Sequence, residues 1–137
     1  MYLIDTNVVS ELRRLRPHGG VVAWLRDTRD EDLHLSAVTI GEIQAGIEVT
    51  REQDEAKAAE IEAWLMQVAE TYNIISMDAA AFRSWARFMH RRTDDLIEDA
   101  MIAATAAVHN LTVVTRNIRD FKAFGVPTLN PFARKAR

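Results

Sequence analysis

Short apolar runs alternate with longer amphipathic stretches along the chain, and this alternation predicts the fold class. The apolar runs suit strands at residues 2–4, 33–38, 73–77, 111–115 and 127–129. The segments between them favour helices over 8–14, 21–27, 39–49, 51–72 and 96–109, a further helix after Asp78, and a short helix or turn at 117–121. Crossovers between such strands place helices on both faces of a sheet. We predict an α/β fold, a three-layer α/β/α arrangement around a mostly parallel sheet of four to five strands.

In two of these helices apolar residues recur at a spacing of three and four, which predicts one buried stripe in each. In the first, the stripe is Ile61, Trp64, Leu65, Val68, Ala69 and Tyr72, and in the second it is Phe82, Trp85, Ala86 and Met89. On the flank of the second helix Arg83 and Arg87 share one face, which suits either a phosphate-contacting ridge or a solvated charged surface.

The length of 137 residues suits one domain, spanning 1–137, and leaves no need for a second core. Cysteine is absent, which excludes disulfides, thiolate metal sites and a cysteine nucleophile. The four histidines are scattered without metal-ligand spacing. Any metal site is therefore expected to use oxygen ligands, which favour Mg²⁺ or Mn²⁺.

The first predicted strand begins at Tyr2, which leaves no room for a signal peptide, and no apolar run approaches the roughly 20 residues of a membrane span. We expect a cytoplasmic protein that does not enter the membrane. The net charge of −3 argues against a broadly basic nucleic-acid coat. However, only three of the 17 basic residues are lysine, and arginine is the residue better suited to bidentate phosphate contacts.

Asp5 follows the first predicted strand, at the edge where ligands gather in an open parallel sheet. The alternative is that Asp5, Thr6 or Asn7 caps the next helix, because all three residue types are preferred there. Glu42 follows the second strand in the same way. It also completes the pattern Thr39-Ile40-Gly41-Glu42, which matches a capping box and offers a structural explanation of its own.

Asp99 shares a helical face with Ile102, Ala103 and Ala106, so an acid heads a stripe that is otherwise small and apolar. A buried carboxylate without a partner is costly, and such groups are normally paired or bound to a cation. We therefore predict a ligand role for Asp99, whereas its neighbour Glu98 is interpreted, with Asp95, as part of a helix cap.

The fourth strand is followed by Thr115, Asn117 and Asp120, with a helix cap at Asn117 as the alternative. Acids and amides from separate strand ends converge only if the sheet is parallel. Such a cluster binds one or two divalent cations, which generate hydroxide and clamp the oxygens of a phosphoryl displacement.

Four segments together resemble the PIN-domain family. They are Ile4-Asp5-Thr6-Asn7-Val8-Val9-Ser10, Ser36-Ala37-Val38-Thr39-Ile40-Gly41-Glu42, Asp99-Ala100-Met101-Ile102-Ala103-Ala104-Thr105-Ala106 and Thr115-Arg116-Asn117-Ile118-Arg119-Asp120-Phe121. Their order and spacing are most similar to the VapC-type toxins of bacterial toxin–antitoxin modules, including the FitB-like branch.

The resemblance implies a Mg²⁺- or Mn²⁺-dependent ribonuclease that cuts single-stranded or loop RNA. It places the three central acids on Asp5, Glu42 and Asp99, which would bind metal and activate water. Its fourth acidic position falls on Asn117, with Asp120 as the nearest acid that would substitute. It further implies a homodimer and a cognate antitoxin that covers apolar grooves of the early helices.

Around these acids Thr6, Asn7 and Thr115 are expected to orient the carboxylates, and Arg83, Arg87 and Arg116 are candidates for RNA contact. One alternative is a PIN fold with weak or no catalysis that binds RNA or protein, which the amide at Asn117 favours. A receiver-type phosphoacceptor is a weaker alternative, because none of the three lysines is placed after a late strand so as to hold a phosphoryl group and the order of the acids is wrong. General RNA processing by the same nuclease also stays open.

Overall fold

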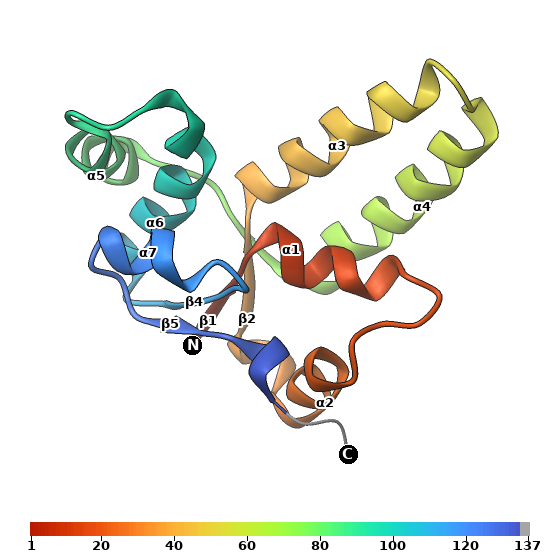
Figure 1. Cartoon of the computed structure of the whole chain (residues 1–137), viewed down its shortest axis with the longest axis horizontal. Helices are drawn as coiled ribbons and strands as arrows, with labels where there is room; N and C mark the ends of the chain where they lie inside the picture. Colours follow the sequence, from red (N-terminus) through yellow and green to blue (C-terminus); the bar gives the residue numbers. More distant parts are fainter. Residues whose placement is uncertain (135–137) are drawn as a thin grey trace.

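A computed structural model describes residues 1–134 and confirms the predicted α/β class. Five parallel strands form one sheet in the order β3-β2-β1-β4-β5 (Figure 1). Their bounds are β1 Tyr2–Ile4, β2 Leu33–Ser36, β3 Asn73–Ile75, β4 Thr112–Val114 and β5 Thr128–Leu129. After β1 the chain adds strands on one side and then returns to the other, so the order reverses between β1 and β4. Ligands of open α/β sheets bind at such a switch point.

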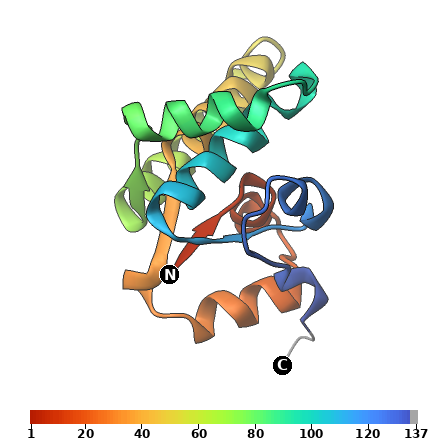
Figure 2. The same cartoon turned by 90° about the vertical axis from the view of Figure 1, so that its left-hand side faces the viewer.

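Helices cover both faces of this sheet, as the strand–helix alternation predicted. They are α1 Thr6–Val9, α2 Gly19–Asp27, α3 Ala37–Arg51, α4 Glu55–Thr71, α5 Ala79–Met89, α6 Ile97–His109 and α7 Ile118–Ala123. Figure 2 shows α2 on one side of the strands and the α5–α6 pair on the other. No helix in residues 1–134 is both long and apolar enough to cross a membrane.

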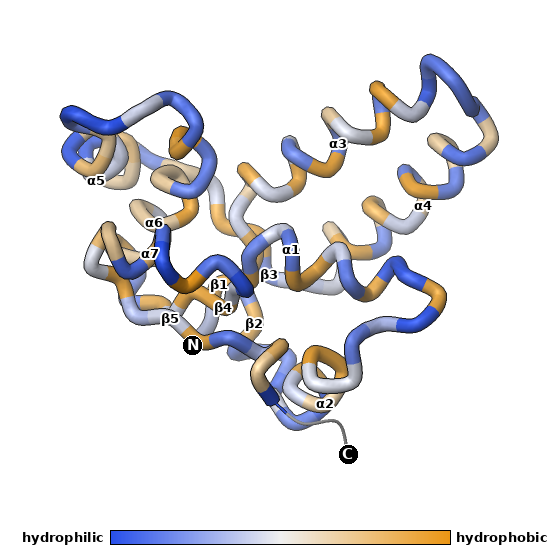
Figure 3. The backbone as a smooth tube through the Cα atoms, viewed as in Figure 1, coloured by the Kyte–Doolittle hydropathy of each residue, from blue (hydrophilic) through white to orange (hydrophobic). Residues whose placement is uncertain are grey.

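The two faces of the sheet are built from alternate residues of the same strands, since successive strand side chains point in opposite directions. Leu3 and Val113 pack with α6 and α7, whereas Ile4 and Val114 pack with α1 and α2. All four side chains are buried. Figure 3 shows the resulting concentration of hydrophobic residues in the strands.

Helices α3 and α4 form a hairpin that extends away from the sheet (Figure 1). The hairpin has a small core of its own, made of Ile47, Ala58, Ile61 and Leu65. Three of these belong to the regular spacing of a buried helical stripe. The hairpin therefore holds its shape through internal packing as well as through its contact with the sheet.

Several predicted boundaries were wrong: among them, the helix expected over 51–72 begins at Glu55 and the strand expected over 73–77 ends at Ile75. Two others have a clear local cause. The helix expected over 8–14 begins at Thr6 and changes to a 3-10 helix at Ser10–Arg13, because Asp5 caps it earlier. The strand expected over 33–38 ends at Ser36, whose Oγ accepts a hydrogen bond from the Val38 amide at 3.0 Å and so caps α3. The capping box expected at Thr39 and Glu42 is therefore also wrong, since both lie inside the helix.

The C-terminal 3-10 helix Pro131–Ala133 packs against the start of α2, and Gly20 permits this approach. A Cβ atom on Gly20 would lie 2.2 Å from the carbonyl oxygen of Arg134 and 2.7 Å from that of Pro131. Arg134 also forms an ion pair with Asp27. The last described residues are thus fixed to α2 by both backbone contact and charge.

Gly20→Ala is expected to destabilise the protein by about 1–3 kcal/mol, because backbone atoms have to shift to admit the methyl group. Urea unfolding measures the change. Gly46→Ala is the matched control, since a Cβ there meets nothing within 4 Å. That control should gain up to about 1 kcal/mol from better helix propensity. Equal stability of the two variants would contradict the close approach at Gly20.

Candidate active site

Asp5 occupies the carboxyl end of β1, and its two carboxylate oxygens have different roles. Its Oδ1 accepts a hydrogen bond from the Thr6 amide at 2.8 Å, which caps α1. Its Oδ2 accepts hydrogen bonds from the Thr115 hydroxyl at 2.8 Å and the Asn7 amide group at 3.1 Å. Burial raises the pKa of Asp5 in spite of the hydrogen bonds from Thr115 and Thr6. The cap interpretation is therefore confirmed for Asp5, whereas its role in an active site stays a prediction.

Thr115 connects the ends of β1 and β4. Its buried hydroxyl donates to Asp5, accepts from the Asn117 backbone amide at 2.9 Å, and lies 3.3 Å from the Asn7 side-chain nitrogen. Asn7 in turn accepts from the Arg116 backbone amide at 3.2 Å. These bonds fix the orientation of the Asp5 carboxylate relative to the loop after β4.

Glu42 reaches the same edge from the second turn of α3. Its Oε1 lies 3.1 Å from the Thr6 hydroxyl, which is also 3.1 Å from the Thr39 hydroxyl. The pKa of Glu42 is raised to about 7, and burial is the largest cause. The charges of Asp5, Glu98 and Asp99 raise this pKa further, whereas the hydrogen bond from Thr6 lowers it. A carboxyl group with this pKa is only partly ionised at neutral pH.

Asp99 lies in the first turn of α6, above the buried residues Ile102, Ala103 and Ala106 of the predicted stripe. Its Oδ2 accepts a hydrogen bond from the Asn117 side chain at 3.2 Å. Burial and the nearby charges of Asp5, Asp120 and Glu98 raise the pKa of Asp99 to about 6.

Asn117 stands at the N-cap position of α7, but its side chain makes no capping hydrogen bond. Its amide nitrogen instead donates to both Asp99 at 3.2 Å and Asp120 Oδ2 at 2.9 Å. The alternative that Asn117 is simply a side-chain helix cap is therefore wrong. An amide donor between two carboxylates reduces the repulsion between them.

Glu98 acts on the acidic edge through its charge, although its position suggested a helix cap formed with Asp95. Helix α6 has no side-chain cap, and the Asp95 carboxylate accepts from the Thr93 hydroxyl instead. The charge of Glu98 contributes to the raised pKa of both Glu42 and Asp99. Its position next to Asp99 in the first turn of a helix was the available signal.

The arginines predicted for RNA contact do not form one group. Arg116 is exposed beside the carboxylates, with its Cζ 3.6 Å from the ring centroid of Phe132. Arg83 and Arg87 are exposed on α5, and no hydrogen bond or ion pair among residues 1–134 joins them to the acids.

The donor set fits a hard divalent cation in its chemistry. Carboxylate oxygens of Asp5, Glu42 and Asp99 face one edge of the sheet, and each has a raised pKa, so a positive charge there is favoured. No ion pair in the described part of the chain involves these three acids. The described residues contain no ready-made set of three or more metal-ligating acids or histidines. An ion held here would thus have few protein ligands and several waters, as is usual for Mg²⁺.

Comparison with known proteins places the chain among relatives that match it from end to end. A family model described as the PIN domain matches residues 2–126, which include every acid described above. Toxin FitB of Neisseria gonorrhoeae is 32% identical, over 96% of this chain and 99% of that protein. VapC ribonuclease Y4jK of Sinorhizobium fredii is 32% identical, over 96% of this chain and 98% of that protein.

The fold comparison agrees with the sequence comparison. The crystal structure of FitAcB from Neisseria gonorrhoeae superposes with a TM-score of 0.82 at 32% identity. The match spans 96% of this chain and 99% of that chain.

The raised pKa values predict an unusual dependence of stability on pH for metal-free protein. At a pH between the pKa of the unfolded chain and the higher pKa of the folded protein, the folded state binds more protons. The protonated carboxyl groups therefore stabilise the fold at low pH. This stabilisation is lost as the pH rises through about 6 for Asp99 and about 7 for Glu42. Glu42→Gln should remove part of this pH dependence, so the variant should be more stable than the parent at about pH 8 but not at about pH 5. Urea unfolding in EDTA tests this difference.

Glu48→Gln is the control, because Glu48 is exposed and its pKa is lowered by hydrogen bonds from Arg51 and Gln44. That variant should show no such gain in stability at the higher pH. If Glu42→Gln also gained nothing there, the electrostatic description of the acidic edge would be wrong.

Proposed function

The chain belongs to the PIN-domain family, and we propose that it is a metal-dependent endoribonuclease that acts as the toxin of a toxin–antitoxin pair. The observation that carries the proposal is the gathering of three carboxylates at the switch point between β1 and β4. Asp5 is buried, Glu42 and Asp99 are half-buried, and none of them forms an ion pair within residues 1–134. Relatives with the names toxin and ribonuclease match nearly the whole chain, which supports the same activity.

Asp5, Glu42 and Asp99 are the residues proposed to hold Mg²⁺ or Mn²⁺, directly or through water, with Asn117 or Asp120 completing the site. When bound, such an ion lowers the pKa of a water and neutralises charge on the phosphate. Thr115 and Asn7 keep Asp5 oriented through their hydrogen bonds to its Oδ2.

Glu42 is the residue proposed to take up the proton of the attacking water. Its Oε1 lies within hydrogen-bond distance of the Thr6 hydroxyl, and no hydrogen bond in residues 1–134 engages Oε2.

The partners and the place of action belong to the same proposal. A toxin that cuts RNA in its own cell acts in the cytoplasm and needs an antitoxin that binds it there. We also propose a homodimer. The edge strand β3 and the helix after it expose Ile74 and Phe82, with 37% and 47% of their surface accessible, which suits a protein contact.

Arg116 is proposed to contact RNA phosphates beside the site, since its guanidinium is held over Phe132 and forms no ion pair in the described part of the chain. Arg83 and Arg87 remain candidates for a more distant contact, because both are exposed and share one face of α5.

Cleavage of a labelled RNA by the partner-free protein should require Mn²⁺ or Mg²⁺ and stop in EDTA. Asp99→Asn should lower the cleavage rate by about 10²-fold or more. Even residues that only hydrogen-bond to metal ligands change metal affinity or activity by about 10- to 100-fold when they are mutated. Asp94→Asn, an exposed acid of the preceding turn, is the matched control and should cut normally. Equal activity of the two variants, or full activity in EDTA, would refute the proposal.

Asn117→Asp tests whether the amide sets the metal requirement. The substitution replaces a donor to Asp99 and Asp120 with a third carboxylate about 3 Å from each. Metal-free stability at about pH 8 should fall, and Mn²⁺ should bind more tightly than in the parent. Thermal unfolding with and without Mn²⁺ measures both, and a variant that is destabilised but gains no stability from Mn²⁺ would exclude Asn117 from the metal site.

A further inference from the structure

Three adjoining hollows run between the first helical turns and the α3–α4 hairpin, and together they are called here the hairpin groove. The first, of about 290 Å³, is lined by Thr6 and Glu42 at the acidic edge and continues to Arg13 and Trp64. The second, of about 220 Å³, shares Arg13 and Trp64 and reaches Lys57. The third, of about 480 Å³, shares Arg13 and Lys57. The shared lining makes the groove continuous from Glu42 outward.

The charge of the groove changes sign along its length. Its inner end carries the Glu42 carboxylate, whereas its outer end is lined by Arg13, Arg14, Arg16 and Lys57. Within residues 1–134, Arg13 and Arg16 take part in no ion pair. Arg14 forms an ion pair with Glu11 at 3.4 Å, and Lys57 forms one with Glu60 at 3.8 Å. The outer end therefore has a positive excess on a protein whose net charge is negative.

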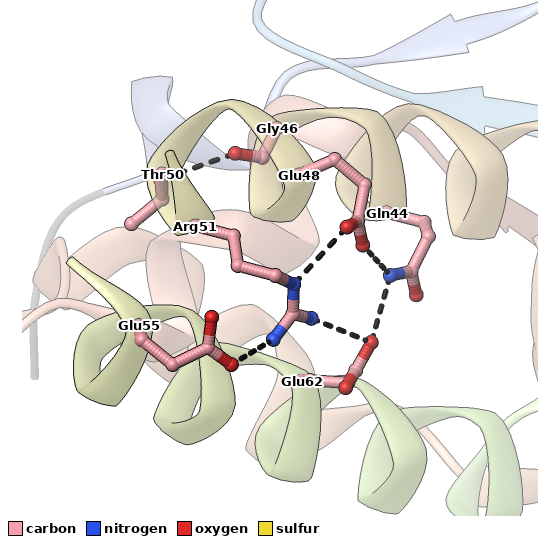
Figure 4. A network of polar contacts seen from close by, with 7 residues as sticks. All are labelled: Gln44, Gly46, Glu48, Thr50, Arg51, Glu55 and Glu62. Atoms are coloured by element: carbon pink, nitrogen blue, oxygen red, sulfur yellow. Dashed lines mark hydrogen bonds and ion pairs between the residues drawn. The ribbon is translucent and has the colours of Figure 1, made fainter. Parts of the chain in front are cut away.

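The wall of the groove is held rigid by a polar network between α3 and α4 (Figure 4). The Arg51 guanidinium contacts Glu48 at 3.1 Å, Glu55 at 2.8 Å and Glu62 at 3.2 Å. Gln44 donates to Glu48 and Glu62 at 2.7 and 2.8 Å. Because these bonds tie the two helices together, the groove is present before anything binds in it.

We propose that the hairpin groove is the path of single-stranded RNA leaving the carboxylate site, with its phosphates at Arg13, Arg16 and Lys57 and a base against Trp64. The inference rests on the proposed ribonuclease function. A positive groove with an aromatic side chain in its wall has the two elements that bind single strands without sequence preference. The charge of the outer end complements the polyanion, and Arg13 lines all three hollows as the chain turns away from Glu42.

Gly46 supplies a steric test, because it lines the first hollow and a Cβ there meets nothing within 4 Å. Gly46→Leu, made in the Asp99→Asn background so that RNA is not cut, should weaken binding of a fluorescent single-stranded RNA by roughly tenfold. Gly41→Leu is the matched control on the same helix, where a Cβ also has free space but does not line the groove. It should bind RNA as the parent does.

The salt dependence of RNA binding tests the charges. Arg13→Gln, Arg16→Gln and Lys57→Gln should each lower the slope of log affinity against log salt by about 0.7, the value for one phosphate of a single strand. Arg26→Gln, an exposed arginine on α2 outside the groove, should leave the slope unchanged. Unchanged slopes in all three groove variants, together with unchanged binding by Gly46→Leu, would overturn the path and leave the groove to a protein segment.

The two proposals fail in different ways. If the parent cuts RNA with metal but the groove variants bind RNA normally, only the path is wrong. If the parent neither cuts nor binds RNA, the ribonuclease proposal itself fails, and the path fails with it.

Discussion

The parallel pairing of β1 with β4 is the constraint on which the candidate site depends. Ile4 lies opposite Val114, and the Asp5 amide donates to the Val114 carbonyl at 2.9 Å, so the two strands end side by side. The next residues, Asp5 and Thr115, then meet through a buried hydrogen bond. A shift of one residue in this register would turn the two side chains to opposite faces, and the cluster would be lost even though the sheet could still form.

The acidic edge works against the stability of the fold. Burial raises the pKa of all three carboxyl groups, and the charges of neighbouring acids raise the pKa of Glu42 and Asp99 further. The hydrogen bonds from threonine and asparagine side chains offset these shifts only in part. The two cores that hold the site are made of packed aliphatic, alanine and aromatic side chains on either face of the sheet. This division, a stable core below and an unfavourable charge cluster at the strand ends, is typical of sites where function and stability compete.

The sequence predicted the class of the fold and offered Asp5 as a helix cap, but it did not predict the cap at Ser36. The parallel sheet and the helices on both faces followed from the alternation of elements, and parallel strands deliver Asp5 and Thr115 to one edge. Glu42 and Asp99 lie in α3 and α6, so their place beside Asp5 was expected from the apolar stripe below Asp99 and from the family resemblance. The capping box at Thr39 was wrong because Ser36 provides a cap one turn earlier. The role of Asn117 as a donor between two acids depends on how α6 and α7 pack, which no local pattern contains.

The hairpin groove could not be predicted from the sequence pattern. Arg13 and Lys57 are 44 positions apart in the sequence, and they line one hollow only because the α3–α4 hairpin folds back beside the first helical turns. Glu42 belongs to α3, so the helix that carries a carboxylate of the site also forms one wall of the groove. The contacts of Arg51 that fix the hairpin therefore also fix the direction in which the groove leaves the acids. A net charge of −3 conceals this arrangement, since Arg13, Arg16 and Lys57 gather at the outer end of the groove while Glu42 lies at its inner end.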